Sequence, residues 1–220
     1  MAEDPVAETW LLIDAAGPWN MIGLVRDGKW LCRSMNDGDF LAMLQPATDQ
    51  LLKEAKLKLE DLAGAMYASG PGSTLGLRLA AMFIRSLMEM PKLNHWRCLQ
   101  YHNLELALWS IRDSGSSTAV APWRRDRLHQ VKWNSMEDPS FEHGYLSPAD
   151  AESQQIPGIE LGRRPPAFSN TINWLPYPID DLPVLLAEHP QLLQLTESPT
   201  PYSAEEPEFA RWDPQRHKKP

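Results

Sequence analysis

A glycine-rich turn at residues 70–76, with the sequence GPGSTLG, constrains this chain more than any other feature. It follows an apolar run and precedes an amphipathic one, a pattern that predicts a strand, a tight turn and a helix. Gly70 and Gly72 allow a positive φ or a close backbone approach that a Cβ would hinder. Pro71 fixes its own φ, and Ser73 stands where its side chain can cap the following helix.

A glycine loop before a helix also suggests phosphate binding, because free N–H groups and positive dipole gather at a helix N-terminus. The spacing fits neither standard phosphate motif. A Walker A loop continues with Lys and then Ser or Thr, whereas Gly76 is followed by Leu77 and Arg78. The dinucleotide fingerprint has its third glycine one residue closer. We therefore favour a structural turn that sets the direction of the helix.

The spacing of apolar residues predicts an α/β chain. The expected elements are, in order, a strand at 9–16, a hairpin at 21–33, a helix at 39–58, a strand at 62–69, a helix at 76–90, a strand at 95–101, a helix at 102–113, a hairpin at 117–133, a helix at 179–188 and a short strand at 192–196. Pro46 predicts a kink or a restart in the first helix. Asp14 ends the first, apolar strand, where a carboxylate either anchors a loop or belongs to a site.

The helix expected at 76–90 is apolar on more than one side. One sheet can bury only one side of a helix. The other side requires a further layer or a partner subunit.

The composition limits the functions that this chain can have. Of its 220 residues 43% are hydrophobic, so a sizeable core can form. A net charge of −8 argues against a protein that binds nucleic acid unaided, because basic contacts to phosphate dominate such binding. Two cysteines are too few for a disulfide framework. Without a signal-peptide pattern or a long apolar run, we expect a cytoplasmic protein with no membrane contact.

The segment at 70–78, GPGSTLGLR, resembles the GPGSFTGLR signature of the TsaB (YeaZ) family. That family provides the non-catalytic partner subunit in the bacterial machinery that makes threonylcarbamoyladenosine in tRNA. Residues 10–16 resemble its opening strand, and residues 122–128 resemble its Asp-Ala-Arg-Arg segment. Thr74 and Leu75 stand where the family usually has Phe and Thr, so the chain resembles a divergent member.

The resemblance implies an actin-like ATPase (ribonuclease H-like) fold. Residues 1–114 would form a β-β-β-α-β-α N-terminal half with the partner-binding helices. Residues 115–200 would form a reduced second half, and residues 201–220 a loosely held tail.

The resemblance also implies partners. The chain would pair with and activate a TsaD-like protein through the helices at 39–58 and 76–90, and so support threonylcarbamoyl transfer to adenosine 37 of tRNA. A TsaE-like ATPase is a further expected partner, tRNA would be met only through the complex, and the chain would form a homodimer when its partner is absent. The turn that fixes the interface helix comprises Gly70, Pro71, Gly72, Ser73 and Gly76. The expected interface residues are Arg78, Leu79, Met82, Phe83, Arg85 and Ser86.

Patterns for catalysis are missing from the sequence. No two of the six histidines are four residues apart, so the helical His-x-x-x-His metal pair of TsaD is absent. The Gly-Gly dipeptide of an actin-like phosphate turn does not occur, and neither does a Gly-x-Ser-x-Gly elbow. We therefore expect no catalytic residue, no metal and no cofactor, with Asp14 as a vestigial nucleotide-site residue.

Three interpretations stay open beside this one. Arg124, Arg125 and Arg127 either contact tRNA phosphates or an acidic partner, or form a solvated basic face. A second alternative is a diverged actin-like small-molecule kinase or ATPase with Asp14 as its base. A scaffold outside the tRNA pathway is the third alternative.

Overall fold

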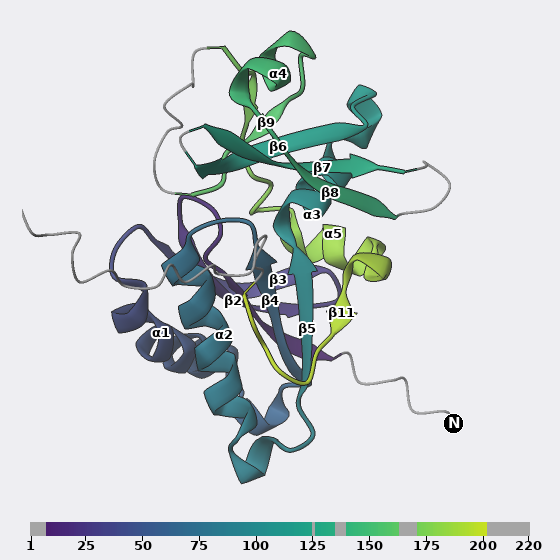
Figure 1. Cartoon of the computed structure of the whole chain (residues 1–220). Helices are drawn as coiled ribbons and strands as arrows, with labels where there is room; N and C mark the ends of the chain where they lie inside the picture. Colours follow the sequence, from purple (N-terminus) through teal and green to yellow (C-terminus); the bar gives the residue numbers. More distant parts are fainter. Residues whose placement is uncertain (1–7, 125, 135–139, 163–170, 202–220) are drawn as a thin grey trace, which may run out of the picture.

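The computed structural model describes residues 8–124, 126–134, 140–162 and 171–201, and its strands form two sheets (Figure 1). The six-stranded sheet has the order β11-β5-β4-β1-β2-β3, and the five-stranded sheet has the order β10-β9-β6-β7-β8. The strands of the first sheet are β1 (Thr9–Asp14), β2 (Asn20–Arg26), β3 (Lys29–Asn36), β4 (Gly64–Gly70), β5 (Arg97–His102) and β11 (Gln194–Leu195). Those of the second are β6 (Thr118–Arg124), β7 (Arg127–Trp133), β8 (Phe141–Leu146), β9 (Gly158–Ile159) and β10 (Trp174–Leu175).

The helices are α1 (Phe40–Ala55), α2 (Thr74–Met88), α3 (Asn103–Ser110), α4 (Pro148–Ser153) and α5 (Leu182–Glu188). Short 3-10 helices lie at Leu59–Asp61, Pro91–Leu93, Arg112–Ser114 and Pro190–Leu192. Among the described residues no helix is long and apolar enough to cross a membrane.

Strand β1 is the centre of the first sheet, with β2 antiparallel on one side and β4 parallel on the other. Its side chains alternate between two hydrophobic clusters because successive residues of a strand point to opposite faces. Leu11 and Ile13 pack with residues of α1 and α2, whereas Leu12 packs with residues of α3, α5 and the second sheet. The unbroken apolar run of this strand is therefore buried on both faces, as its sequence predicts.

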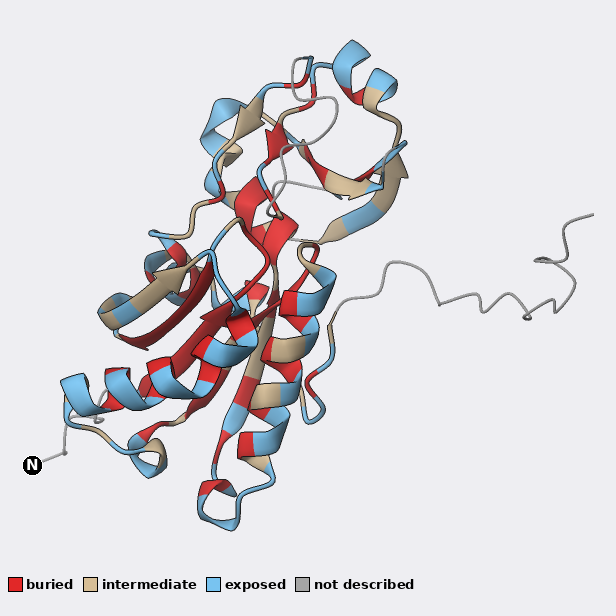
Figure 2. Cartoon of the chain, turned by 90° about the vertical axis from the view of Figure 1, so that its left-hand side faces the viewer, coloured by how far each residue is buried: buried red, intermediate tan, exposed pale blue. Residues whose placement is uncertain are grey.

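Helices α1 and α2 lie side by side on one face of the first sheet (Figures 1 and 2). Figure 2 looks onto these helices, with their buried bands against the sheet and their exposed positions facing outward. Pro46 lies inside α1, which continues through it, so the expected restart does not occur.

The second sheet begins with an antiparallel meander of β6, β7 and β8, to which β9 and β10 add in parallel. Helix α3 links the two sheets, because Leu104 and Leu108 share one hydrophobic cluster with Ala119 and Val131. The chain then returns to the first sheet, where β11 pairs with β5.

The predicted order of elements is confirmed from β1 to β7, and α5 and β11 lie within the last two predicted elements. The second half also contains β8, α4, β9 and β10, which the sequence pattern does not indicate. Nearly all of the expected tail at 201–220 lies outside the described residues.

Candidate functional site

The glycine turn packs directly against the loop that follows β1. A Cβ at Gly72 would lie 2.5 Å from the Cα of Ala16, and one at Gly76 would lie 2.8 Å from the carbonyl oxygen of Ala15. Gly70 has a φ of 137°, and its peptide bond to Pro71 is cis. Ser73 caps α2 as predicted, because its Oγ accepts a hydrogen bond from the Gly76 N–H at 3.3 Å. Two backbones therefore meet at this turn with no room for side chains between them.

The carboxylate of Asp14 is fully buried beside this turn. Its Oδ2 accepts hydrogen bonds from the hydroxyls of Tyr101 and Tyr177, each at 2.7 Å, and its Oδ1 accepts one from the Ala16 N–H at 2.8 Å. Burial raises the pKa of Asp14, while these hydrogen bonds act in the opposite direction. Burial, together with the charge of the same carboxylate, raises the pKa of both tyrosines well above the usual range.

Asn103 joins this network to the glycine turn. Its Oδ1 accepts a hydrogen bond from the Gly70 N–H, and its Nδ2 donates to the Tyr177 hydroxyl, both at 3.0 Å. The end of β1, the turn and the start of α3 thus form one buried hydrogen-bonded unit. This arrangement favours the interpretation of Asp14 as a loop anchor, because its carboxylate meets protein donors and not solvent.

The outward side of α2 carries apolar side chains. Leu75 is 69% exposed and Met82 is 67% exposed, and Leu41 on the neighbouring α1 is 63% exposed. Of the expected interface residues, Arg78, Met82, Arg85 and Ser86 are exposed. Leu79 and Phe83 are half-buried and pack against the cluster beneath α1 and α2. We call Leu41, Leu75, Leu79, Met82 and Phe83 the α1–α2 face.

The predicted basic cluster lies at the β6–β7 turn. The Arg124 guanidinium stands over the ring of Trp123, 4.2 Å from its centroid, and Trp123 in turn stacks on Tyr145. Arg127 is exposed on β7, and Arg125 lies outside the described residues. Trp133, the second tryptophan near this cluster, is buried in the core and stacked on Trp109.

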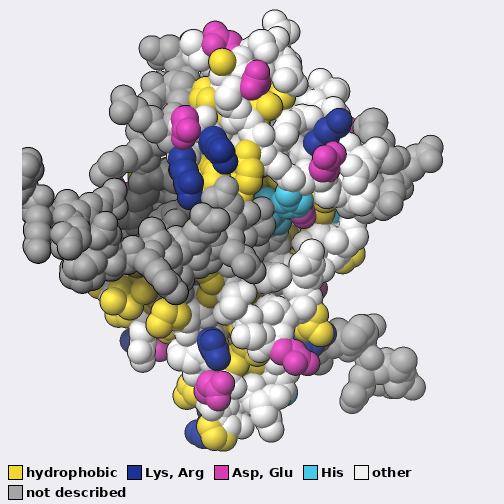
Figure 3. Space-filling view, in the orientation of Figure 1, with side chains coloured by type: hydrophobic (Ala, Val, Ile, Leu, Met, Phe, Trp, Pro, Cys, Tyr) yellow, Lys and Arg dark blue, Asp and Glu magenta, His cyan; other side chains and the backbone are white. Residues whose placement is uncertain are grey.

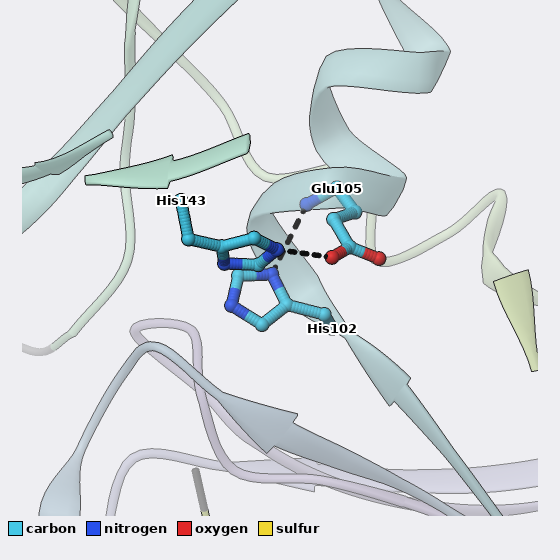
Figure 4. Close-up of side chains that lie close together, drawn as sticks. All are labelled: His102, Glu105 and His143. Carbon is cyan, nitrogen blue, oxygen red and sulfur yellow. Dashed lines mark hydrogen bonds and ion pairs between the residues drawn. The ribbon is translucent and has the colours of Figure 1, made fainter. Parts of the chain in front are cut away.

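A cluster of His102, Glu105 and His143 lies where the two sheets approach each other (Figure 4). His102 ends β5, Glu105 is in the first turn of α3, and His143 belongs to β8. The Nε2 of His143 and the Oε1 of Glu105 are 2.6 Å apart, and the His102 and His143 rings meet edge to face with centroids 4.5 Å apart. Figure 3, in the orientation of Figure 1, shows histidine at the surface near the middle of the view, beside an acidic side chain.

The cluster lines a pocket of about 350 Å³, which also contacts Ser69, Gln100, Tyr101 and Thr200. Burial lowers the pKa of His102 well below its usual range, and the neighbouring His143 and His129 lower it further. This shift favours the neutral form of the His102 imidazole.

Comparison with known proteins supports the resemblance to the TsaB (YeaZ) family that the glycine turn indicates. Residues 39–93, which span α1, β4 and α2, match the family model of TsaD, the tRNA N6-adenosine threonylcarbamoyltransferase. The structure of YeaZ from Pseudomonas aeruginosa superposes on 89% of this chain and 99% of its own, with a TM-score of 0.60 and 18% identity. The chain has the fold of YeaZ.

A second YeaZ-like structure supports the same assignment. The crystal structure of an uncharacterised protein with similarity to peptidase YeaZ from Pseudomonas aeruginosa covers 90% of this chain and is itself covered completely, with a TM-score of 0.61 and 18% identity. No curated protein has significant sequence similarity to the chain. The predicted actin-like (ribonuclease H-like) ATPase fold is confirmed.

Two features of this YeaZ-like chain escape sequence reasoning. His143 is 38 residues from Glu105, and Tyr177 is 163 residues from Asp14, so no local spacing relates them. The only sequence signal near the histidine cluster is His102 itself, at a predicted strand-to-helix junction.

Proposed function

We propose that this chain is a TsaB-like, non-catalytic subunit that pairs with a TsaD-like protein and supports threonylcarbamoyl transfer to adenosine 37 of tRNA. The observation that carries the proposal is the α1–α2 face. Three large apolar side chains there, on two adjacent helices, are more than three-fifths exposed. Exposed apolar side chains on neighbouring helices are typical of interaction sites on proteins.

The surroundings of this face suit a protein partner. Arg78 and Arg85 are exposed on the same helix and provide charged groups around the apolar positions. Interfaces of this type combine an apolar centre, where Met and aromatic residues are enriched, with a polar rim. Leu79 and Phe83 anchor this side of α2 to the chain, because they pack against its own core.

The family match points to the chemistry of the partner. The segment that matches the TsaD model contains both helices of the face and the turn between β4 and α2. A TsaD-like protein that shares this segment would offer a similar pair of helices. Two such pairs can pack as a four-helix bundle across an interface.

The buried Asp14 supports a non-catalytic role for this subunit. A base or metal-binding carboxylate has to reach substrate or solvent, whereas Asp14 is enclosed by Tyr101 and Tyr177. The reacting groups would then come from the TsaD-like partner. In this proposal Arg124 and Arg127 meet tRNA only after the complex forms.

Light scattering on a size-exclusion column tests the pairing. The chain mixed with the TsaD-like protein of the same genome should elute with the mass of a heterodimer, and alone it should form a homodimer. Met82→Asp should weaken pairing by at least about thirtyfold, because losing a central contact costs about 2 kcal/mol or more.

Leu195→Asp is the matched control, since Leu195 is 68% exposed on β11, away from this face. Met82 is a sharper target than Phe83, whose half-buried ring also contributes to folding. Unchanged pairing of Met82→Asp, or no association of the unmodified proteins, would refute the proposal.

A further inference from the structure

His102, Glu105 and His143 bring two imidazoles and one carboxylate together from elements far apart in the sequence (Figure 4). One ligand atom from each residue lies within 4.8 Å of the others. His143 comes from the second sheet, and the other two residues come from the junction of β5 and α3. The cluster therefore spans the two sheets.

We propose that these three residues bind a divalent transition-metal ion, with Zn²⁺ as the reference ion. Two imidazole nitrogens and a carboxylate oxygen form a common donor set for zinc and for neighbouring first-row metals. This proposal is independent of the pairing through the α1–α2 face, which lies on other elements.

The spacing of the donor atoms is close to what an ion requires. Zinc ligands at about 2.0–2.2 Å from the ion stand about 3.3–3.6 Å from one another in a tetrahedral site. The widest pair in the cluster therefore has to close by at most about 1.5 Å, and the 2.6 Å pair of Glu105 and His143 has to open slightly. His143 is exposed and Glu105 is only partly buried, which leaves room for the side-chain rotations that this adjustment requires.

The electrostatics of the cluster also suit a cation. Glu105 brings a negative charge that offsets part of the charge of the ion.

The pocket leaves room for a further ligand. All three residues line the same cavity of about 350 Å³, together with Ser69, Gln100 and Thr200. Three protein ligands leave the fourth position of a tetrahedral ion for water or another small oxygen ligand. The site is thus expected to hold the metal with one exchangeable position facing the pocket.

Isothermal titration of the chelator-treated full chain with ZnCl₂ tests the proposal. One ion per chain should bind, and His143→Gln and Glu105→Gln should each weaken binding at least tenfold. His95→Gln and Glu188→Gln are matched controls on exposed residues outside the cluster and should bind zinc like the unmodified chain.

A second readout separates a metal site from a simple His–Glu ion pair. Co²⁺ added in place of Zn²⁺ should give the visible d–d absorption of a low-coordinate nitrogen and oxygen site, and Glu105→Gln should abolish it. If His143→Gln does not fold, Glu105→Gln and the Co²⁺ spectrum still decide. Absence of zinc binding, or binding that neither variant weakens, would overturn the proposal.

Discussion

Replacing Gly72 with alanine tests the contact between the glycine turn and the loop after β1. The added Cβ would lie 2.5 Å from the Cα of Ala16, 2.6 Å from its carbonyl oxygen and 2.7 Å from its Cβ. All three atoms belong to the backbone or sit next to it, so no flexible side chain can move aside. Either α2 or the loop has to shift.

Ala16 resists such a shift because both of its backbone groups are engaged. Its N–H donates to Asp14 Oδ1 and its carbonyl accepts from the Gly162 N–H, each at 2.8 Å. Forcing an extra methyl group into a packed interior costs about 1–3 kcal/mol. For a chain of this size each kcal/mol lowers Tm by about 2–4 °C. Gly72→Ala should therefore lower Tm by about 2–12 °C.

Thermal unfolding followed by circular dichroism measures this change. Gly38→Ala is the matched control, because a Cβ at Gly38 meets no atom within 4 Å. The control should stay within about 0.5 kcal/mol of the unmodified chain, as is usual for surface changes. Equal Tm values for the two variants would refute the proposed role of the contact. If Gly72→Ala is destabilised, its pairing with the TsaD-like protein should weaken as well, because α2 begins at this turn.

Two further predictions concern buried polar groups. Burial lowers the pKa of His129 to about 4, so below pH 6.5 the unfolded chain takes up a proton that the folded chain does not. This difference should reduce the free energy of unfolding by about 1.4 kcal/mol per pH unit as the pH falls from about 6.5 to 4. In urea unfolding at several pH values, His129→Gln should therefore lose stability less steeply than the unmodified chain. The same pH dependence in both proteins would contradict this. Tyr177→Phe should cost about 1.5–3 kcal/mol, because it removes a hydrogen bond to the buried Asp14 and the nearer of two acceptors of the Asn103 amide. A loss below about 0.5 kcal/mol in urea unfolding would show that Asp14 does not depend on this tyrosine.

The regular elements of the first sheet were predictable because each carries its own periodic signal. The apolar run of β1 indicates a strand covered on both faces, and the three- and four-residue spacing in α2 indicates a helix. The turn between β4 and α2 was predictable from glycine, proline and serine at positions where their backbone properties matter. Pro46 did not interrupt α1, whose buried side chains hold the helix on the sheet.

The second sheet carries weaker local signals. Strands β9 and β10 have two residues each, and they exist because they pair with neighbouring strands. Their sequences contain no alternation long enough to indicate a strand.

The α1–α2 face was predictable only in part. Helical spacing indicates that α2 has a second apolar side, but it does not say which side meets the sheet. Leu79 and Phe83 were expected to face a partner, and both are partly covered by the chain's own core. Leu75, which was considered only as a departure from the family signature, is the most exposed large apolar residue of the helix.

The histidine cluster and the Asp14 network depend on the tertiary fold alone. Their partners lie in β8 and in the segment before α5, regions without a clear periodic pattern. Only the packing of the second sheet on α3 brings His143 to Glu105.

The most direct test of the proposed function is a tRNA modification assay with purified components. The TsaD-like protein of the same genome, a threonylcarbamoyl donor and tRNA are incubated with and without this chain, and the modified adenosine is quantified. The proposal predicts that modification requires the chain and fails with Met82→Asp, while Leu195→Asp supports it fully. Equal modification in the absence of the chain would contradict a role for it in this reaction.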